Sequence, residues 1–160
     1  SKWYDFKNGR ALVKEGRYYK IINREGVEVF RSRKRINYHF DHLFVVSKKY
    51  VYNQNSSFIK KYKYVKPLND STILIMGVNG YGILNRHGRE VLEPVYDRVK
   101  IFKDNTYKVN SNLYGLANTH GDIYSEPEYV HVEKSDNDKI LLKRWGNYEY
   151  IKPDGEFIYR

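Results

Sequence analysis

Short apolar runs separated by turn signals recur along the whole chain. The run 73–76 (Ile-Leu-Ile-Met) is followed by Asn79-Gly80, and a second apolar segment starts at Tyr81. Asn-Gly suits a two-residue type I′ hairpin, because both central residues need a positive φ. Residues 81–85 then alternate between the two faces of a strand. The pattern therefore predicts short antiparallel strands joined by tight turns.

The rest of this unit can be predicted from the residues that follow. Asn85 and Gly88 have the spacing of a type I turn, with Asn at its first position and Gly at its last. A third strand is expected at 90–92. Pro94, in the linker 93–97, is expected to stop further strand pairing because proline lacks a backbone N–H. The unit is predicted to be a three-stranded antiparallel meander.

The same unit recurs five times, so the chain is predicted to be one repeat domain over residues 1–160. In the second copy Ser57 stands where glycine is expected. Four intervals of 31, 31, 33 and 34 residues separate the anchoring tyrosines, which are Tyr19, Tyr50, Tyr81, Tyr114 and Tyr148. The approximate repeats are 6–35, 36–66, 67–99, 100–132 and 133–160.

The predicted fold class is all-β, with about fifteen short strands in five stacked meanders, since a single small unit cannot bury both faces. A helix is conceivable only at 30–41. A curved open array is favoured, because the short repeats leave little chain for a four-stranded blade. The alternative is a closed propeller-like ring, in which Tyr4-Asp5 would complete the last repeat.

Glycine after the anchoring tyrosine is expected to allow close approach of a neighbouring backbone. Only the third and fourth repeats keep it, as Gly82 and Gly115. Lys20, Val51 and Glu149 occupy this position elsewhere, so packing must differ there.

The pattern from Tyr81-Gly82 to Asp97 resembles the WG (KWG) repeat of bacterial β-rich repeat proteins. Tyrosine replaces tryptophan at every anchor, and Trp145-Gly146 precedes its anchor Tyr148, so this pair is expected to lie in the preceding turn. The resemblance implies an all-β repeat array with a binding or scaffolding role. It implies no shared catalytic residues and no cofactor.

The residues that carry chemistry form no recognisable active site. The chain has no cysteine, which excludes disulfides and thiolate metal sites. His39 and His42 flank Asp41, but they would point to opposite faces of a strand and have no identifiable third ligand, so no metal site is predicted. His87 and His120 share a turn position through repeat ancestry. We therefore expect a protein that is not an enzyme.

Positive charge is concentrated in one part of the chain, whose net charge is +10. Residues 31–66 contain ten Lys and Arg against one acidic residue. Tyrosines interleave with these cations, as a surface that stacks bases and neutralises phosphates would require. The candidate binding residues are Arg31, Arg33, Lys34, Arg35, Lys48, Lys49, Lys60, Lys61, Tyr62, Lys63 and Tyr64.

Two functions are compatible with these features. The first is a non-enzymatic module that binds or scaffolds another protein, since aromatic residues are favoured at interfaces. The alternative is binding of DNA, RNA or another polyanion through residues 31–66. Glycan binding is a third, weaker hypothesis. The longest apolar runs have four residues, too few to span a bilayer. No targeting segment is recognised, and a cytoplasmic location is favoured only slightly.

Overall fold

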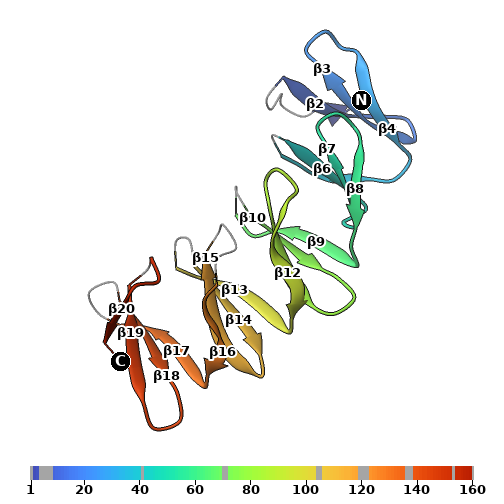
Figure 1. The fold of residues 1–160 in the computed structure, drawn as a ribbon. Helices are drawn as coiled ribbons and strands as arrows, with labels where there is room; N and C mark the ends of the chain where they lie inside the picture. The colour runs from blue at the N-terminus through green and yellow to red at the C-terminus, as the bar shows by residue number, and fades with distance from the viewer. Residues whose placement is uncertain are drawn as a thin grey trace. The chain divides into compact units, whose positions relative to one another are not determined.

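The computed structural model describes residues 2–3, 9–40, 42–69, 72–103, 106–118, 123–135, 139–152 and 154–159. These residues form twenty strands in five sheets and no helix (Figure 1). The predicted all-β fold is therefore confirmed. In the described part of 30–41, where a helix was conceivable, the chain instead forms strands at 30–32 and 36–39. Accordingly, the described residues contain no helix long and apolar enough to cross a membrane.

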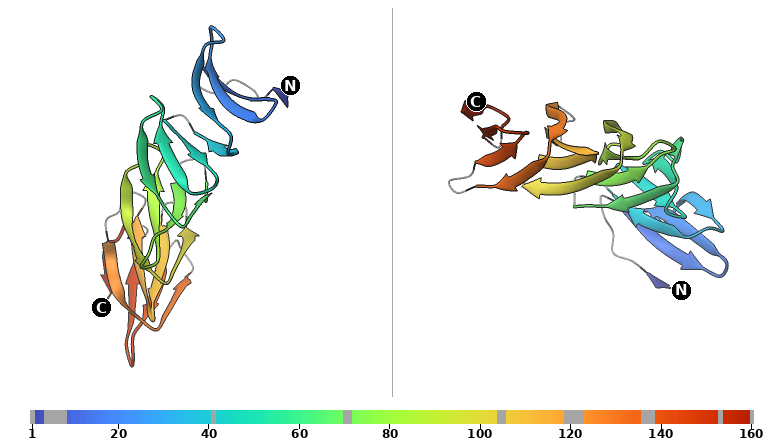
Figure 2. Two further views of the ribbon diagram at one scale, coloured as in Figure 1. Left: turned by 90° about the vertical axis from the view of Figure 1, so that its right-hand side faces the viewer. Right: turned by 90° about the horizontal axis from the view of Figure 1, so that it is seen from below.

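Each sheet is built from strands that are consecutive in the chain, as two further views also show (Figure 2). The first sheet contains β1 (Lys2–Trp3), β2 (Arg10–Glu15), β3 (Tyr18–Asn23) and β4 (Glu28–Ser32). The second contains β5 (Ile36–His39), β6 (Leu43–Val46), β7 (Tyr50–Asn53) and β8 (Phe58–Lys61). The third contains β9 (Tyr64–Pro67), β10 (Thr72–Met76), β11 (Tyr81–Asn85) and β12 (Glu90–Tyr96). The fourth contains β13 (Arg98–Lys103), β14 (Thr106–Ser111), β15 (Leu113–Asn118) and β16 (Ile123–Tyr129). The fifth contains β17 (His131–Lys134), β18 (Ile140–Lys143), β19 (Tyr148–Ile151) and β20 (Phe157–Tyr159).

The predicted three-stranded meander is wrong by one strand, because every sheet has four. The additional strand comes directly after the linker and pairs with the next strand in sequence, as β13 pairs antiparallel with β14 from Arg98 opposite Asn110. The choice between an open array and a closed ring stays a prediction, and Tyr4-Asp5 lie outside the described residues.

Pro94 does not end a strand, contrary to the prediction. It lies within β12, and Pro127 lies at the corresponding place in β16. Both strands are at the edge of their sheets, and the register between β15 and β16 shifts around Pro127. Edge strands and such irregularities are the places in a sheet where proline is tolerated.

Contacts divide the chain into two compact units. The first consists of residues 1–76 and 84–89, and the second of residues 77–83 and 90–160. Within the first unit, Ile21 of the first sheet packs with Ile36, Phe44 and Val46 of the second. A further cluster joins the second and third sheets and includes Leu43, Val45, Val51, Val65, Ile73, Ile75 and Leu84. Since β6 contributes to both clusters, all four of its residues are buried.

Within the second unit, the fourth and fifth sheets share one core. Its fully or almost fully buried members are Leu116, Tyr129, Val132, Ile140, Leu142 and Ile151. Strand alternation accounts for this arrangement, since one face of β17 and β18 points into the core and the other points away.

The predicted close approach at Gly82 and Gly115 is confirmed. A Cβ atom on Gly82 would lie 2.4 Å from the Leu92 carbonyl oxygen and 2.7 Å from the Pro94 nitrogen. On Gly115 it would lie 2.5 Å from the Ser125 carbonyl oxygen. These contacts are with the backbone of the neighbouring edge strand, which cannot give way as a flexible side chain can.

The second repeat is out of step with the others by one residue. Ser56, not Ser57, takes the glycine position, with a φ of 66° and its N–H donating to the Asn53 carbonyl oxygen at 3.0 Å. The turn therefore begins one residue earlier than the spacing from Tyr50 predicts, and β7 ends at Asn53. Tyr50 thus points to the opposite face and packs toward the first sheet, so it is not equivalent to Tyr19.

The turn between β10 and β11 also differs from its prediction by one residue. The Gly77 N–H donates to the Gly80 carbonyl oxygen at 2.8 Å, so the central residues are Val78 and Asn79. Glycine is needed at position 80 because the backbone at the end of β12 approaches it closely: a Cβ there would lie 2.6 Å from the Tyr96 carbonyl oxygen. Trp145-Gly146 lies in the turn between β18 and β19, as predicted.

Candidate functional site

The three basic segments predicted from the sequence meet around the turn between β6 and β7. The Ser47 N–H donates to the Arg35 carbonyl oxygen at 2.8 Å, which fixes the first segment beside the turn. The Lys49 and Lys48 carbonyl oxygens accept from the N–H groups of Tyr62 at 2.9 Å and Val65 at 2.8 Å, which fixes the third. The cations gathered here are Lys34, Arg35, Lys48, Lys49, Lys60, Lys61 and Lys63, and we call them the basic rim.

Tyr50 lies between lysines from two of these segments. The Lys34 ammonium is 4.9 Å from the centre of the Tyr50 ring, and the Lys61 ammonium is 5.7 Å away. The electron-rich face of a tyrosine attracts cations at such distances, which offsets part of the repulsion between two lysines. Tyr50 therefore holds like charges close together, a role that the sequence did not reveal.

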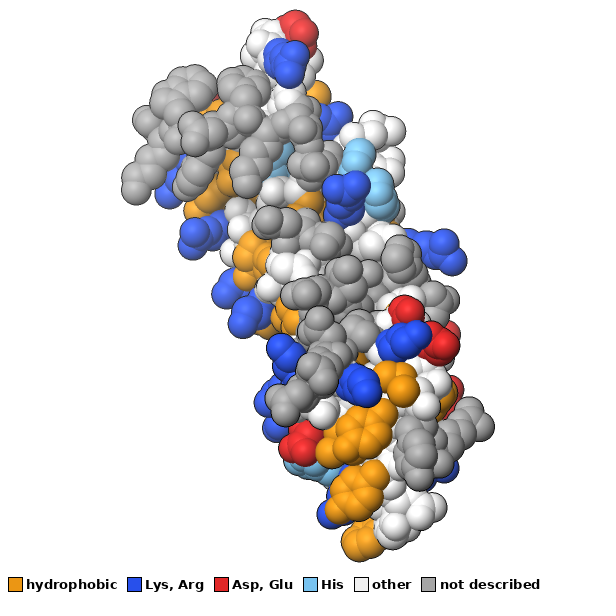
Figure 3. Space-filling model, turned by 90° about the vertical axis from the view of Figure 1, so that its left-hand side faces the viewer, with side chains coloured by type: hydrophobic (Ala, Val, Ile, Leu, Met, Phe, Trp, Pro, Cys, Tyr) orange, Lys and Arg blue, Asp and Glu red, His pale blue; other side chains and the backbone are white. Residues whose placement is uncertain are grey.

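Few carboxylates oppose the basic rim. Among the described residues, no ion pair involves Lys34, Arg35, Lys48, Lys49 or Lys61, and all five are exposed. On the side of the molecule drawn in Figure 3, Lys and Arg side chains likewise recur with fewer Asp and Glu side chains beside them. Such a surface attracts anions.

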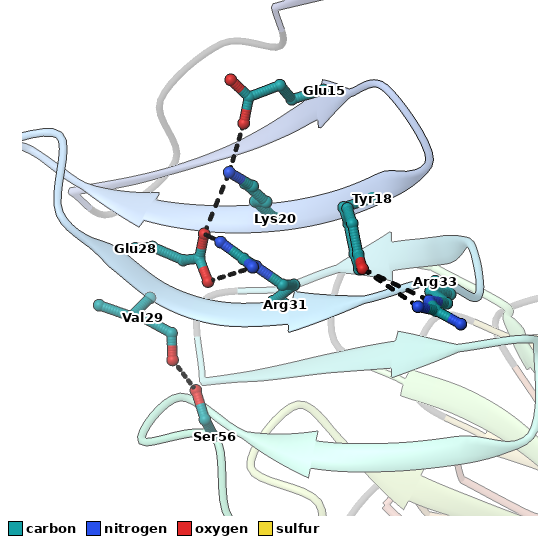
Figure 4. A network of polar contacts seen from close by, with 8 residues as sticks. All are labelled: Glu15, Tyr18, Lys20, Glu28, Val29, Arg31, Arg33 and Ser56. Carbon is teal, nitrogen blue, oxygen red and sulfur yellow. Dashed lines mark hydrogen bonds and ion pairs between the residues drawn. The ribbon is translucent and has the colours of Figure 1, made fainter.

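Arg31 and Arg33 belong to a separate cluster at the first sheet (Figure 4). Arg31 forms a two-pronged ion pair with Glu28, with both nitrogen–oxygen distances 2.8 Å, and Glu28 also binds Lys20 at 3.2 Å. Arg33 lies near the Tyr18 hydroxyl, at 3.4 Å. Hydrogen bonding to Arg31 lowers the pKa of Glu28, so this arginine is already compensated within the chain.

The two tyrosines predicted to bind have different environments. Tyr62 is only 4% exposed and belongs to the core between the second and third sheets. Tyr64 is half-buried on β9. Since the lysines cover Tyr50 as well, the rim has abundant charge but few open aromatic faces on which a base could stack.

The turn that carries Lys48 is conformationally strained. Ser47 and Lys48 have φ values of 55° and 54°, the left-handed conformation that side chains with a Cβ rarely adopt. The Lys48 N–H donates to the Asn37 side-chain oxygen at 2.8 Å, which stabilises the turn. Neither residue is Gly or Asn, so a turn with two positive φ values could not be predicted at this position.

Replacing Lys48 with glycine is therefore expected to raise the free energy of unfolding by about 1 kcal/mol, because glycine tolerates this conformation. Lys49→Gly removes the same charge at the next residue, whose φ is not positive, and is expected to lower stability by about 0.5–1 kcal/mol. Urea denaturation measures both variants. Equal effects of the two substitutions would show that charge, and not backbone strain, controls stability here.

The histidines form a contact that the sequence did not predict. His42 stacks on His87 with ring centroids 4.4 Å apart and planes 24° from parallel. Asp41 lies outside the described residues. Within the described part of the chain, no group of three His, Asp or Glu side chains could hold a metal ion.

A polar network around the buried Tyr129 lies in the second unit. The Tyr129 hydroxyl, which is fully buried, donates to Glu149 at 2.5 Å, and Arg144 donates to Tyr129 at 3.1 Å and to Glu128 at 2.6 Å. Burial and then the hydrogen bond to Glu149 raise the pKa of Tyr129. The buried Nε of Arg144, however, has no hydrogen-bond partner and lies 3.7 Å from a Glu149 carboxylate oxygen.

Residues 81–112 match the family model of the WG containing repeat. This segment of the chain is similar to a WG repeat. The resemblance stated from the sequence is thereby confirmed. The matched segment runs from β11 to the residue after β14, so one sequence repeat contains the second half of one sheet and the first half of the next. No curated protein matches the chain.

Two solved structures of Hsv2 from Kluyveromyces lactis are similar to the chain, with 13% and 12% identity and TM-scores of 0.35. The WD40 β-propeller domain of Doa1 is similar at 13% identity and a TM-score of 0.32. Each match covers 94% of this chain, and 58%, 59% and 64% of the respective structures. The chain thus spans about three fifths of the solved structures that it matches.

Proposed function

We propose that the chain is a non-enzymatic interaction module that binds an acidic surface of a partner protein through the basic rim. The observation that carries this proposal is the convergence of three basic segments, distant in sequence, around one hydrogen-bonded turn. Little side-chain pairing has to be broken before binding, because no ion pair among the described residues involves Lys34, Arg35, Lys48, Lys49 or Lys61. The WG repeat supports a role in protein interaction.

Nucleic-acid binding is the second candidate function. The charge density of residues 31–66 would suit phosphate contacts, because each neutralised phosphate releases counterions. Against it, Tyr62 is buried and the lysines cover Tyr50, which leaves little surface for base stacking. The arrangement therefore supports an acidic protein better than a single-stranded nucleic acid.

Charge reversal tests the proposal. The triple variant Lys48→Glu, Lys49→Glu, Lys61→Glu is expected to bind poly-glutamate roughly 30-fold more weakly than the unchanged chain, because each exposed ion pair contributes up to about 1 kcal/mol. Isothermal titration at two salt concentrations measures the loss. Oligo(dT) titrated under the same conditions tests the second candidate, and tighter binding of oligo(dT) than of poly-glutamate would favour it.

A matched control changes the same amount of charge on other strands and turns. Lys14, Lys100 and Lys134 are exposed and lie outside the rim. Reversing these three to glutamate is expected to weaken poly-glutamate binding less than about threefold, through long-range electrostatics only. Equal losses in the two triple variants would contradict a localised site and leave only a general attraction to polyanions.

A further inference from the structure

The fourth sheet has a lysine at a strand position that is leucine in the sheets before and after it. The position lies opposite the third residue of each sheet's first strand. It is occupied by Leu74 in the third sheet, Lys108 in the fourth and Leu141 in the fifth, and all three residues are half-buried. A lysine at such a position gives up apolar packing and places a charge where water is partly excluded, which costs stability. This exchange of leucine for lysine therefore needs an explanation outside the packing of the repeat.

Two further cations lie on the same face of the fourth sheet. Lys100 pairs directly opposite Lys108, although like charges that face each other across paired strands repel. Arg98 precedes Lys100 by two residues, so strand alternation places it on the same face, opposite Asn110. Arg98 and Lys100 are both exposed, and no ion pair among the described residues involves either of them. Three positive charges thus gather on one face.

The position of the Lys108 ammonium is fixed by contacts within the chain. It donates to the Val132 carbonyl oxygen at 3.0 Å and lies 3.8 Å from the centre of the Tyr114 ring. Burial and then the charge of Lys100 lower the pKa of Lys108. An anion bound beside the two lysines would offset their repulsion, because a nearby opposite charge stabilises the charged form.

The three cations line a small hollow of about 60 Å³. No carboxylate is among the described residues around it, which are Arg98, Lys100, Lys108, Asn110 and Tyr114. One water molecule needs about 10–15 Å³ of such space, so the hollow can admit a group of about four to six non-hydrogen atoms. This volume is too small for a sugar or a nucleobase, but it suits a tetrahedral oxyanion.

We propose that this hollow binds a phosphate group, either as free phosphate or as the phosphate of a phosphorylated side chain. Such a group carries a charge of about −1.5 to −2 at pH 7 and several acceptor oxygens. The Arg98 guanidinium can bind two of these oxygens at once, and Lys100 can bind another. Lys108 adds a third positive charge at a position that the fold holds fixed.

The phosphate site is distinct from the basic rim and does not depend on the function proposed for the rim. Its lining residues belong to the second compact unit, whereas the rim belongs to the first. A carboxylate carries a single charge on two oxygens that lie in one plane, so it compensates three cations less well than phosphate does. Poly-glutamate is therefore not expected to occupy the hollow, and Lys100 is expected to contribute little to its binding.

Isothermal titration of the whole chain at constant ionic strength tests the site. Inorganic phosphate is expected to bind at least tenfold more tightly than acetate, and a phosphoserine peptide at least tenfold more tightly than the same peptide with glutamate. Tighter binding of the phosphopeptide than of inorganic phosphate would support the site and identify a phosphorylated side chain as its ligand. Equal or weaker binding of the phosphopeptide would support the site and identify free phosphate. Absence of both preferences would overturn the proposal.

Single substitutions locate the binding. Arg98→Gln and Lys100→Gln are each expected to weaken phosphate binding at least fivefold. Arg89→Gln and Lys134→Gln are matched controls, since both residues are exposed and lie outside the hollow, and each is expected to change binding less than twofold. Circular dichroism of the variants checks that they remain folded. Equal losses in the two pairs would overturn the proposal, because they would show attraction to the overall positive charge alone.

Oligo(dT) and poly-glutamate separate this site from the functions considered for the basic rim. The phosphates of oligo(dT) are diesters with one charge each, so Arg98→Gln is expected to change its binding less than twofold. Inorganic phosphate that saturates the hollow is expected to leave the affinity for poly-glutamate within twofold, at matched ionic strength. A fivefold loss of oligo(dT) binding in Arg98→Gln would assign the hollow to nucleic acid, and competition between phosphate and poly-glutamate would place phosphate at the rim. Either result would overturn the proposal.

Discussion

Gly82→Ala is expected to lower the free energy of unfolding by about 3 kcal/mol, at the upper end of the usual cost of overpacking. The new methyl group would lie 2.4 Å from the Leu92 carbonyl oxygen and 2.7 Å from the Pro94 nitrogen. Both atoms belong to the backbone of β12, so the edge strand would have to move away from β11. Urea denaturation followed by far-ultraviolet circular dichroism measures the loss.

Gly146→Ala is the matched control for this substitution. Gly146 has a φ of 86°, but a Cβ there would meet no atom within 4 Å. The variant therefore tests backbone conformation without crowding, and its expected cost is about 1 kcal/mol. If Gly82→Ala cost no more than Gly146→Ala, the close approach between β11 and β12 would not be a determinant of stability.

Phe44→Ala is expected to be at least as damaging, with a loss of about 3–5 kcal/mol. Phe44 is 1% exposed and lies on β6, which is buried on both sides. Its ring stacks on Tyr52 with centroids 5.3 Å apart and packs against Phe30 at 4.6 Å. Removing the Phe44 ring would leave a cavity between the first and second sheets, because the closely packed strands around it cannot move far enough to fill the space.

Phe58→Ala separates the effect of burial from that of losing any aromatic contact. Phe58 also contacts Tyr52, edge to face at 5.5 Å, but it is 55% exposed. The same truncation is expected to cost less than about 1 kcal/mol there, because folding buries little of the apolar surface of Phe58. Similar losses for Phe44→Ala and Phe58→Ala would contradict the placement of the core at β6.

Much of the fold could be predicted because the repeat encodes its turns and close contacts locally. Asn85 and Gly88 form the expected turn, with the Gly88 N–H donating to the Asn85 carbonyl oxygen at 3.0 Å and a Gly88 φ of 85°. The crowding at Gly82 and Gly115 was also predicted, since glycine among apolar strand residues indicates a close backbone.

The fourth strand of each sheet could not be predicted in the same way. Residues such as 98–103 have no glycine-rich hairpin before them, and the preceding proline indicated an end to pairing. In the structure that proline lies on a sheet edge, where its missing N–H has no consequence for the inner strands. The out-of-step second repeat was missed because Ser56 adopts a positive φ without being glycine.

The basic residues were identified from the sequence, but their grouping was not. Lys34, Lys48 and Lys61 are separated by more than ten residues each and converge only through backbone bonds to the turn at 47–49. The fold that brings these lysines together also keeps other predicted binding residues out of the site. Arg31 is bound by Glu28, and Tyr62 is drawn into the core.

Lysine footprinting tests the central claim that the basic rim is the interaction surface. The reactivity of each lysine toward an acetylating reagent is measured by mass spectrometry, with and without bound poly-glutamate. We expect strong protection of Lys34, Lys48, Lys49 and Lys61, and little change at Lys14, Lys100 and Lys134, which are exposed outside the rim. Uniform protection of all seven lysines, or protection confined to those outside the rim, would contradict the account.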